Sequence, residues 1–189
     1  MKTKPIPKVQ PIQGSNRVLA RLEKPLIEPF LRWSKPQKLR GLSQGLREAE
    51  RSLRKYPRRM WDWSPKPGTH WCIREVLWHL ADSEANYYVR LRRAAAESGA
   101  TISPWDENRW ALAVPYRKQS AALAWETFRA LRTANIAWVK ILSPGVWNRR
   151  VRHPDFGVMS IDRIVGACNW HTKHHQGQME RRYLEWKVR

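Results

Sequence analysis

The sequence lacks any run of about 18 apolar residues, the length that a transmembrane helix needs. It also lacks the apolar core of a secretory signal peptide. Cys72 and Cys168 are its only cysteines, too few to form a disulfide scaffold in a chain of 189 residues. We therefore expect a soluble, cytoplasmic protein without a membrane span, long enough for one domain plus a tail.

Several catalytic signatures are also missing. The sequence contains no glycine-rich phosphate-binding loop and no Cys-x-x-Cys pair, and no internal repeat is visible. These absences argue against a P-loop nucleotide site, a thioredoxin-like redox site and a repeat architecture. Any chemistry must come from another pattern of residues.

Acidic residues are scarce, with 16 Asp and Glu against 36 Lys and Arg, which gives a formal net charge of +20. The excess is greatest near the start, because residues 1–60 contain 16 Lys and Arg but only 4 Asp and Glu. Such a charge favours contact with polyanions such as nucleic acid, anionic membranes or acidic proteins. A solubilising surface explains the charge equally well, so both interpretations stay open.

Residues 1–40 contain six prolines and ten basic residues, and their apolar residues form no helical stripe. Because proline breaks helices, we predict a flexible basic arm over residues 1–40, and this arm is our candidate for a polyanion contact. The folded domain is then expected over residues 41–189.

Four amphipathic segments carry apolar residues at helical spacing and are expected to form long helices. They lie at about residues 42–56, 70–98 and 120–142, and from residue 160 to an end between 185 and 189. Two long connections, 99–119 and 146–159, separate the last three; the second contains a turn and a short hairpin. This pattern predicts an all-α fold, a four-helix bundle with two long connections and a flexible basic N-terminal arm. A connection as long as 99–119 often forms the wall or lid of a functional site.

The fourth expected helix contains three of the six histidines, His171, His174 and His175. Residues four apart on an α-helix are separated by only about 40° round the axis, so His171 and His175 project side by side. Both fall within the apolar stripe of the helix, whereas His174 lies at its edge. A hydrogen-bonded pair of core histidines and two ligands of one metal ion both fit this pattern.

Three other positions leave alternatives open. His79 lies on the flank of the apolar stripe of the second helix, where either an ordinary half-buried imidazole or a cavity-facing one would fit. Asn135, the one polar member of the third stripe, is either a satisfied core amide or part of a cavity lining. Cys168, one turn before His171, is either a small buried hydrophobe or a further metal ligand.

Three segments together resemble the DinB/YfiT-like superfamily of metalloenzymes. They are Trp71-x-x-Arg-Glu75-x-x-x-His79-Leu-x-Asp82-x-Glu84, His153-Pro-Asp-Phe-Gly157 and His171-x-x-x-His175-x-x-Gln178. The resemblance covers roughly residues 42–185 and implies a four-helix bundle that binds a divalent metal. The ligands that it implies are His79, His171 and His175, with no ligand role for His174.

Three neutral imidazoles leave an open position on a bound ion, which is typical of catalytic sites. Zinc, nickel and iron all suit such a donor set. The ion would activate either water or a thiol, so a hydrolase and a thiol S-transferase are both expected, and the resemblance implies a low-molecular-weight thiol substrate for the second. Glu75 and Asp82 are candidates to orient His79 through its second nitrogen or to act as a general base, although ordinary exposed charges explain them too.

Two other functions fit the sequence. In one, the protein is associated with nucleic acid through the basic arm and some of its 12 tryptophans. In the other, the metal only stabilises the bundle, which associates with partners through the arm or a homodimer face.

Overall fold

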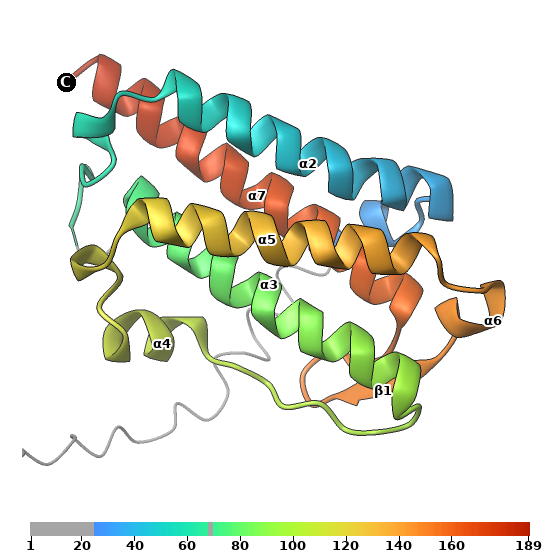
Figure 1. The fold of residues 1–189 in the computed structure, drawn as a ribbon. Helices are drawn as coiled ribbons and strands as arrows, with labels where there is room; N and C mark the ends of the chain where they lie inside the picture. The colour runs from blue at the N-terminus through green and yellow to red at the C-terminus, as the bar shows by residue number, and fades with distance from the viewer. Residues whose placement is uncertain (1–24, 68–69) are drawn as a thin grey trace, which may run out of the picture.

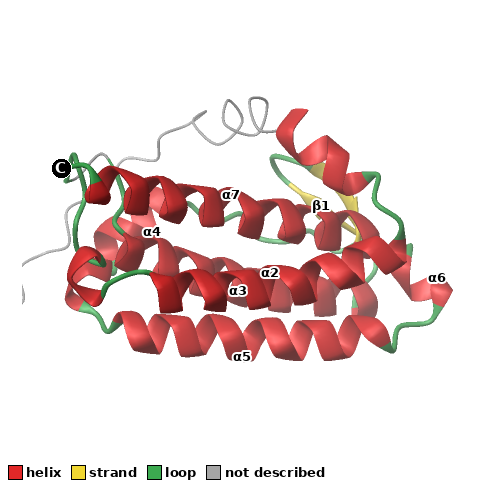
Figure 2. Ribbon diagram, turned by 90° about the horizontal axis from the view of Figure 1, so that it is seen from above, coloured by secondary structure: helices red, strands yellow, loops and turns green. Residues whose placement is uncertain are grey.

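The structure, a computed structural model, describes residues 25–67 and 70–189, and its fold is a bundle of four long helices (Figures 1 and 2). The helices are α2 (Lys35–Lys55), α3 (Ile73–Ala96), α5 (Ala121–Lys140) and α7 (Ile161–Lys187). The expected all-α four-helix bundle is confirmed. None of the described helices is long and apolar enough to cross a membrane.

The directions of the helices explain the long connection between α3 and α5. α3 packs against α5 and α7, while α2 packs against α7 and α5. Figure 1 shows that the neighbours α3 and α5 run in the same direction, as do α2 and α7. A chain that leaves one helix and enters a parallel neighbour must return along the length of the bundle, so a short turn cannot join α3 to α5.

Short elements occupy the connections. They are η1 (Arg58–Met60) after α2, α4 (Glu107–Ala113) and η2 (Tyr116–Lys118) after α3, and α6 (Pro144–Trp147), β1 (Arg150–His153) and β2 (Gly157–Ser160) after α5. β1 and β2 form the expected antiparallel hairpin. The backbone N of Ile102 donates to the carbonyl of Arg152 at 2.9 Å, so the first connection begins alongside this hairpin.

Serine side chains mark the starts of three long helices. The hydroxyl oxygens of Ser34, Ser120 and Ser160 accept hydrogen bonds from backbone N–H groups in the first turns of α2, α5 and α7. Each satisfies one of the N–H groups that a helix start leaves without an intrahelical partner.

The boundary expected after residue 40 is wrong. α2 begins at Lys35, and Pro36 does not prevent this, because a proline in the first turn has no intrahelical hydrogen bond to lose. Lys38 is buried, and its Nζ donates to Oδ2 of Asp162 at 2.6 Å, at the start of α7. Residues 1–24 lie outside the described residues, so a flexible arm there stays a prediction.

The segment before α2 also packs on the bundle. Residues 25–31 are helical, and Ile27 packs against Ala167 and Trp170 of α7. The folded domain therefore includes the described residues from 25 onwards.

Two apolar clusters fill the interior, separated by a layer of buried polar side chains. On α3 this layer falls between Leu80 and Leu91, which belong to different clusters. The layer consists of Glu84, Arg132, Asn135 and Thr172, each only 1% exposed.

Hydrogen bonds link the members of the polar layer, although Nε and Nη1 of Arg132 have no hydrogen-bond partner among the described residues. Nη2 of Arg132 donates to Oε2 of Glu84 at 2.6 Å and to Oγ1 of Thr172 at 2.8 Å. Nδ2 of Asn135 donates to Oε1 of Glu84 at 2.7 Å, so Asn135 is a satisfied core amide. These bonds join α3, α5 and α7, and a shift of one helix along another would leave buried charge without its partner.

The turn of the hairpin encloses a buried histidine. Nδ1 of His153 accepts from the backbone N of Asp155 at 3.1 Å and of Phe156 at 3.4 Å, so this nitrogen carries no proton. Gly157 closes the turn at φ 69°, a left-handed conformation that costs little only for glycine. Burial lowers the pKa of His153 to about 4.

Replacing Arg132 by methionine will destabilise the fold strongly, because Glu84 loses its buried partner. We expect the free energy of unfolding, measured by urea denaturation, to fall by about 3–5 kcal/mol. Arg129→Met is the matched control on the same helix, since its ion pair with Glu126 is exposed, and little change is expected there. Equal losses in the two variants would contradict the role assigned to the buried pair.

Protonation of His153 will contribute to acid destabilisation. Its folded pKa of about 4 lies below the unfolded value of 6.5, so its contribution is present above pH 6.5 and is lost as the pH falls toward 4. Between pH 7 and pH 5 this amounts to about 2 kcal/mol of the free energy of unfolding. Urea denaturation at the two pH values measures this. The fall in the free energy of unfolding from pH 7 to pH 5 should be smaller by this amount in His153→Gln than in the wild type. The same pH dependence in both proteins would refute the assignment.

Candidate metal centre

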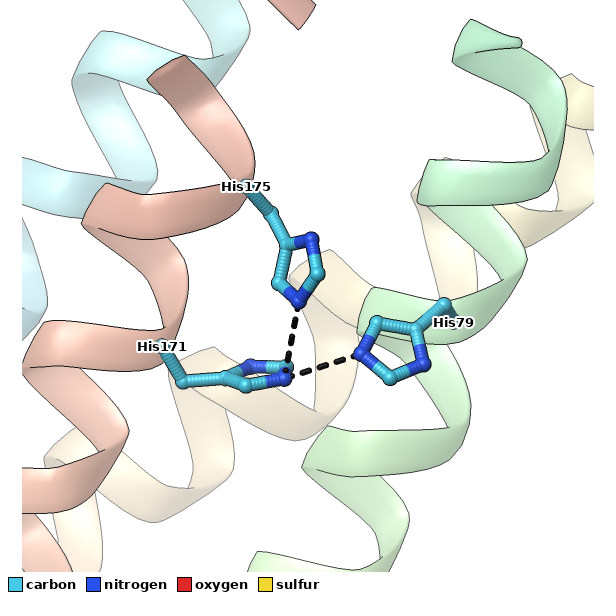
Figure 3. A group of neighbouring side chains, drawn as sticks. All are labelled: His79, His171 and His175. Carbon is cyan, nitrogen blue, oxygen red and sulfur yellow. Dashed lines mark hydrogen bonds between the residues drawn. The ribbon is translucent and has the colours of Figure 1, made fainter. Parts of the chain in front are cut away.

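Three imidazoles from two helices meet at one point in the bundle (Figure 3). His171 and His175 come from consecutive turns of α7, and His79 approaches from α3. Nε2 of His171 lies 2.9 Å from Nε2 of His79 and 3.0 Å from Nε2 of His175. One nitrogen of each ring lies within 4.8 Å of the other two. The structure thus brings together three of the expected site residues.

Hydrogen bonding alone does not account for this arrangement. A neutral imidazole nitrogen carries either one N–H or one lone pair, so Nε2 of His171 cannot bond well to two other Nε2 atoms at once. Two histidine nitrogens that each bind one ion at about 2.0–2.1 Å, at angles between a right angle and tetrahedral, lie about 3 Å apart. The three donors therefore fit a divalent metal ion.

Burial keeps the three histidines neutral. His79 and His175 are only 4% and 6% exposed, whereas His171 is partly exposed. Burial, followed by the neighbouring histidines, lowers the pKa of His79 and His171 well below 6.5, and burial lowers the pKa of His175 to about 3. Because only the unprotonated ring nitrogen can bind a metal, the donors remain available at neutral pH.

Gln178 sets the tautomer of His175. Its Oε1 lies 2.8 Å from Nδ1 of His175 and accepts the proton of that nitrogen, which leaves Nε2 unprotonated toward the cluster. Nε2 of Gln178 lies 3.2 Å from Nε2 of His174 and donates to it. His174 lies outside the cluster, and its hydrogen bond is to Gln178.

Aromatic rings cover the cluster. The ring of Trp105 stacks on His79 with centroids 5.5 Å apart and an interplanar angle of 18°, and Trp71 lies 4.8 Å from the same ring. Tyr87 meets His171 edge-on at 6.0 Å. Because Trp105 belongs to the connection between α3 and α5, this connection forms part of the wall, as its length indicates.

Ser83 places a hydroxyl beside the cluster. Its Oγ lies 3.5 Å from Nε2 of His79 and from Nε2 of His171, and the residue is buried. Sequence reasoning missed Ser83, although its spacing of one helical turn from His79 was a usable signal. Trp105 was missed because no local pattern links a loop residue to a histidine on the preceding helix.

Neither expected carboxylate orients His79, and this part of the expectation is wrong. Nδ1 of His79 is buried without a hydrogen-bond partner among the described residues. Glu75 instead accepts from the backbone N of Cys72 at 2.9 Å and from Nε of Arg117 at 3.0 Å. Glu75 lies in the first turn of α3, where unpaired backbone N–H groups attract a carboxylate.

Asp82 is also engaged elsewhere. Its Oδ2 accepts from the hydroxyl of Tyr116 at 2.5 Å. Burial raises the pKa of Asp82 above its usual value, despite this bond. A half-buried carboxylate with a raised pKa suits a general base better than Glu75 does, and that role stays a prediction.

Cys168 belongs to the core. Its Sγ donates to Oε2 of Glu84 at 3.6 Å, and burial raises the pKa of the thiol. Because a metal binds the thiolate, a buried and protonated thiol is a poor ligand. The interpretation as a small buried residue is the one that the structure supports.

Comparisons with known proteins agree with this fold and site. The model of the DinB superfamily matches residues 42–179. A protein from Oceanobacillus iheyensis named "Putative metal-dependent hydrolase" is 36% identical over 105 residues, 56% of this chain and 60% of that protein. A protein of the same name from Bacillus mycoides is 28% identical over 118 residues, 61% of this chain and 68% of that protein. The matched part of the chain thus spans about 60% of the length of the first relative.

One solved structure has the same fold. It is YfiT from Bacillus subtilis, described as "a probable metal-dependent hydrolase with an unusual four-helix bundle topology". The superposition has a TM-score of 0.73 at 23% sequence identity and covers 82% of this chain and 90% of that one. At 23% sequence identity, the superposition shows that the two proteins share a fold.

Replacing Gln178 by leucine will release the tautomer of His175, because no oxygen then accepts the proton of Nδ1. In metal-free protein, long-range 1H–15N NMR spectra should show His175 protonated at Nδ1 in the wild type and a mixture of tautomers in the variant. In Gln176→Leu, the control, these signals should stay unchanged, since that amide donates to the carbonyl of Gly45. A wild-type His175 protonated at Nε2 would contradict the assignment.

Proposed function

The chain belongs to the DinB superfamily, and we propose that it is a metal-dependent hydrolase whose divalent ion is bound by His79, His171 and His175. The observation that carries the proposal is the approach of three Nε2 atoms to one another, which a single ion explains and hydrogen bonds do not. The names of the relatives support hydrolysis. Three uncharged ligands leave the ion with its full charge and an open position, as catalytic sites do.

A bound divalent ion would supply Lewis acidity to a water nucleophile and to the oxygen of the substrate. The residues around the ion would supply hydrogen bonds, exclude water and accept a proton. Ser83 holds a hydroxyl at 3.5 Å from two of the nitrogens, where it can hydrogen-bond the nucleophile or the substrate. Trp71 and Trp105 exclude bulk water from the His79 side, which strengthens electrostatic interactions within the site. Asp82, three residues after His79 on α3, is our candidate for the group that accepts a proton.

Zinc, nickel and iron all suit three imidazoles, so the donor set alone does not choose among them. Transfer of a low-molecular-weight thiol would use the same site and stays the alternative prediction. The protein's own cysteines do not serve as its nucleophile, because both are buried and burial raises the pKa of Cys72 to about 11. The thiol would therefore come from the substrate. Contact of residues 1–40 with a polyanion, and a homodimer, also stay predictions.

Protein purified without an affinity tag should contain close to one divalent ion per chain by elemental analysis. His79→Ala, His171→Ala and His175→Ala should each abolish this content, because two imidazoles hold an ion far more weakly than three. His174→Ala is the matched control: it removes the neighbouring histidine that lies outside the cluster and should keep the metal. Metal-free wild-type protein from metal-replete cells would contradict the proposal. An equal loss of metal in His174→Ala would contradict it as well.

The metal-loaded protein then separates the activities. Hydrolysis of a panel of carboxylic and phosphate esters that disappears in His171→Ala would support the proposed function. Reaction of a thiol panel with an electrophilic acceptor, without ester hydrolysis, would replace it with thiol transfer. A full metal content without either activity would favour a metal that only stabilises the bundle.

A further inference from the structure

A second surface of the molecule combines cations with aromatic rings. It lies where α2 and α7 end, at the end of the bundle marked by the C-terminus in Figure 1. We call it the cation–aromatic surface; it comprises Lys55, Arg58, Arg59, Lys187 and Arg189 with the rings of Trp61, Trp63, Tyr183 and Trp186. It belongs neither to the histidine cluster nor to the N-terminal arm.

Each cation of this surface lies over a ring. The guanidinium of Arg58 is 4.0 Å from the centroid of Trp61, and that of Arg59 is 5.0 Å from Trp186. Nζ of Lys55 is 4.6 Å from the ring of Tyr183. Contact with a ring face holds a cation in place.

These ring contacts leave most of the charge uncompensated. Arg58, Arg59, Lys187 and Arg189 are exposed, and no carboxylate of the described residues forms an ion pair with them; Lys55 pairs with Glu180. A carboxylate partner would cancel the charge, whereas an aromatic ring only orients it. The surface therefore presents four oriented cations with their charge intact.

Some surface cations elsewhere in the described chain are held by carboxylates. Arg54, Arg93 and Arg129 each form an ion pair with a glutamate three or four residues away on the same helix. The cation–aromatic surface thus differs from ordinary solvated helix faces in the partner that holds its cations.

The combination fits a single-stranded nucleic acid. Such ligands present a phosphate at every nucleotide and bases that stack on aromatic side chains, and the proteins that bind them use cations and rings side by side. A membrane is the poorer fit, because insertion into a bilayer needs aromatic side chains that protrude, whereas Trp63, Tyr183 and Trp186 are only partly exposed.

We propose that the cation–aromatic surface binds single-stranded nucleic acid, with its cations on backbone phosphates and the exposed parts of Trp63, Tyr183 and Trp186 against bases. The proposal is independent of the metal, since none of these residues touches the histidine cluster. It places a polyanion contact on the folded bundle, in addition to any contact of the arm. The net charge of +20 favours the encounter.

The test uses the full-length protein and a fluorescently labelled single-stranded DNA of mixed sequence, titrated over a range of salt concentrations. The surface variant carries Arg58→Gln, Arg59→Gln and Lys187→Gln. The control variant carries Lys140→Gln, Arg150→Gln and Arg163→Gln, three exposed cations at the opposite end of the bundle. Both variants lose the same charge and keep the arm, and circular dichroism checks that each is folded.

We expect wild type and control to bind alike and the surface variant to bind about tenfold or more weakly. The slope of log K against log salt should be smaller in magnitude by about two in the surface variant. The reason is that each of three lost phosphate contacts on a single strand releases about 0.7 of a counterion. Equal weakening in both variants, or no weakening in the surface variant, would overturn the proposal. Binding to phosphatidylserine vesicles but not to the oligonucleotide would overturn it in favour of a membrane contact.

Discussion

The buried ion pair between Glu84 and Arg132 is the interaction on which the arrangement of the helices depends. It lies between the two apolar clusters and joins α3 to α5, while Thr172 brings α7 to the same guanidinium. Apolar contacts tolerate small sliding movements, but two buried charges do not. Thr172 follows His171 directly, and Glu84 lies little more than one helical turn beyond His79. The register that pairs Glu84 with Arg132 therefore also sets His79 opposite His171.

Within this frame, the histidine cluster places three polar rings where their burial costs free energy. Three imidazoles lie among apolar and aromatic side chains, and burial lowers the pKa of each. In such surroundings a polar group needs a partner, and Gln178 supplies one for the outer nitrogen of His175. The inner nitrogens face one another and the hydroxyl of Ser83, an arrangement that suits a bound ion better than a part of the apolar core. A core built only for stability would fill this space with aliphatic side chains.

Much of the fold could be predicted because its signals are local. Apolar periodicity marks all four long helices, and serines cap α5 and α7 where the periodic segments begin. The sequence places the start of the domain too late, because proline usually breaks helices, whereas Pro36 lies in the first turn of α2, where it is harmless. The role of Glu75 was misjudged for a related reason. Sequence spacing places the carboxylate of Glu75 near His79. It cannot show that this carboxylate instead accepts a hydrogen bond from the backbone N–H of Cys72.

The sequence by itself determined the helices, their inward faces and the pairing of His171 with His175, because these follow from rises and angles within one helix. Only the tertiary structure decided which helices became neighbours, and with them the approach of His79, the stacking of Trp105 and the hydroxyl of Ser83. Tertiary packing also brought together the cation–aromatic surface, which combines the end of α2 and the segment after it with the end of α7. These contacts join segments far apart in the chain, and their geometry depends on how whole helices pack, which no local spacing encodes.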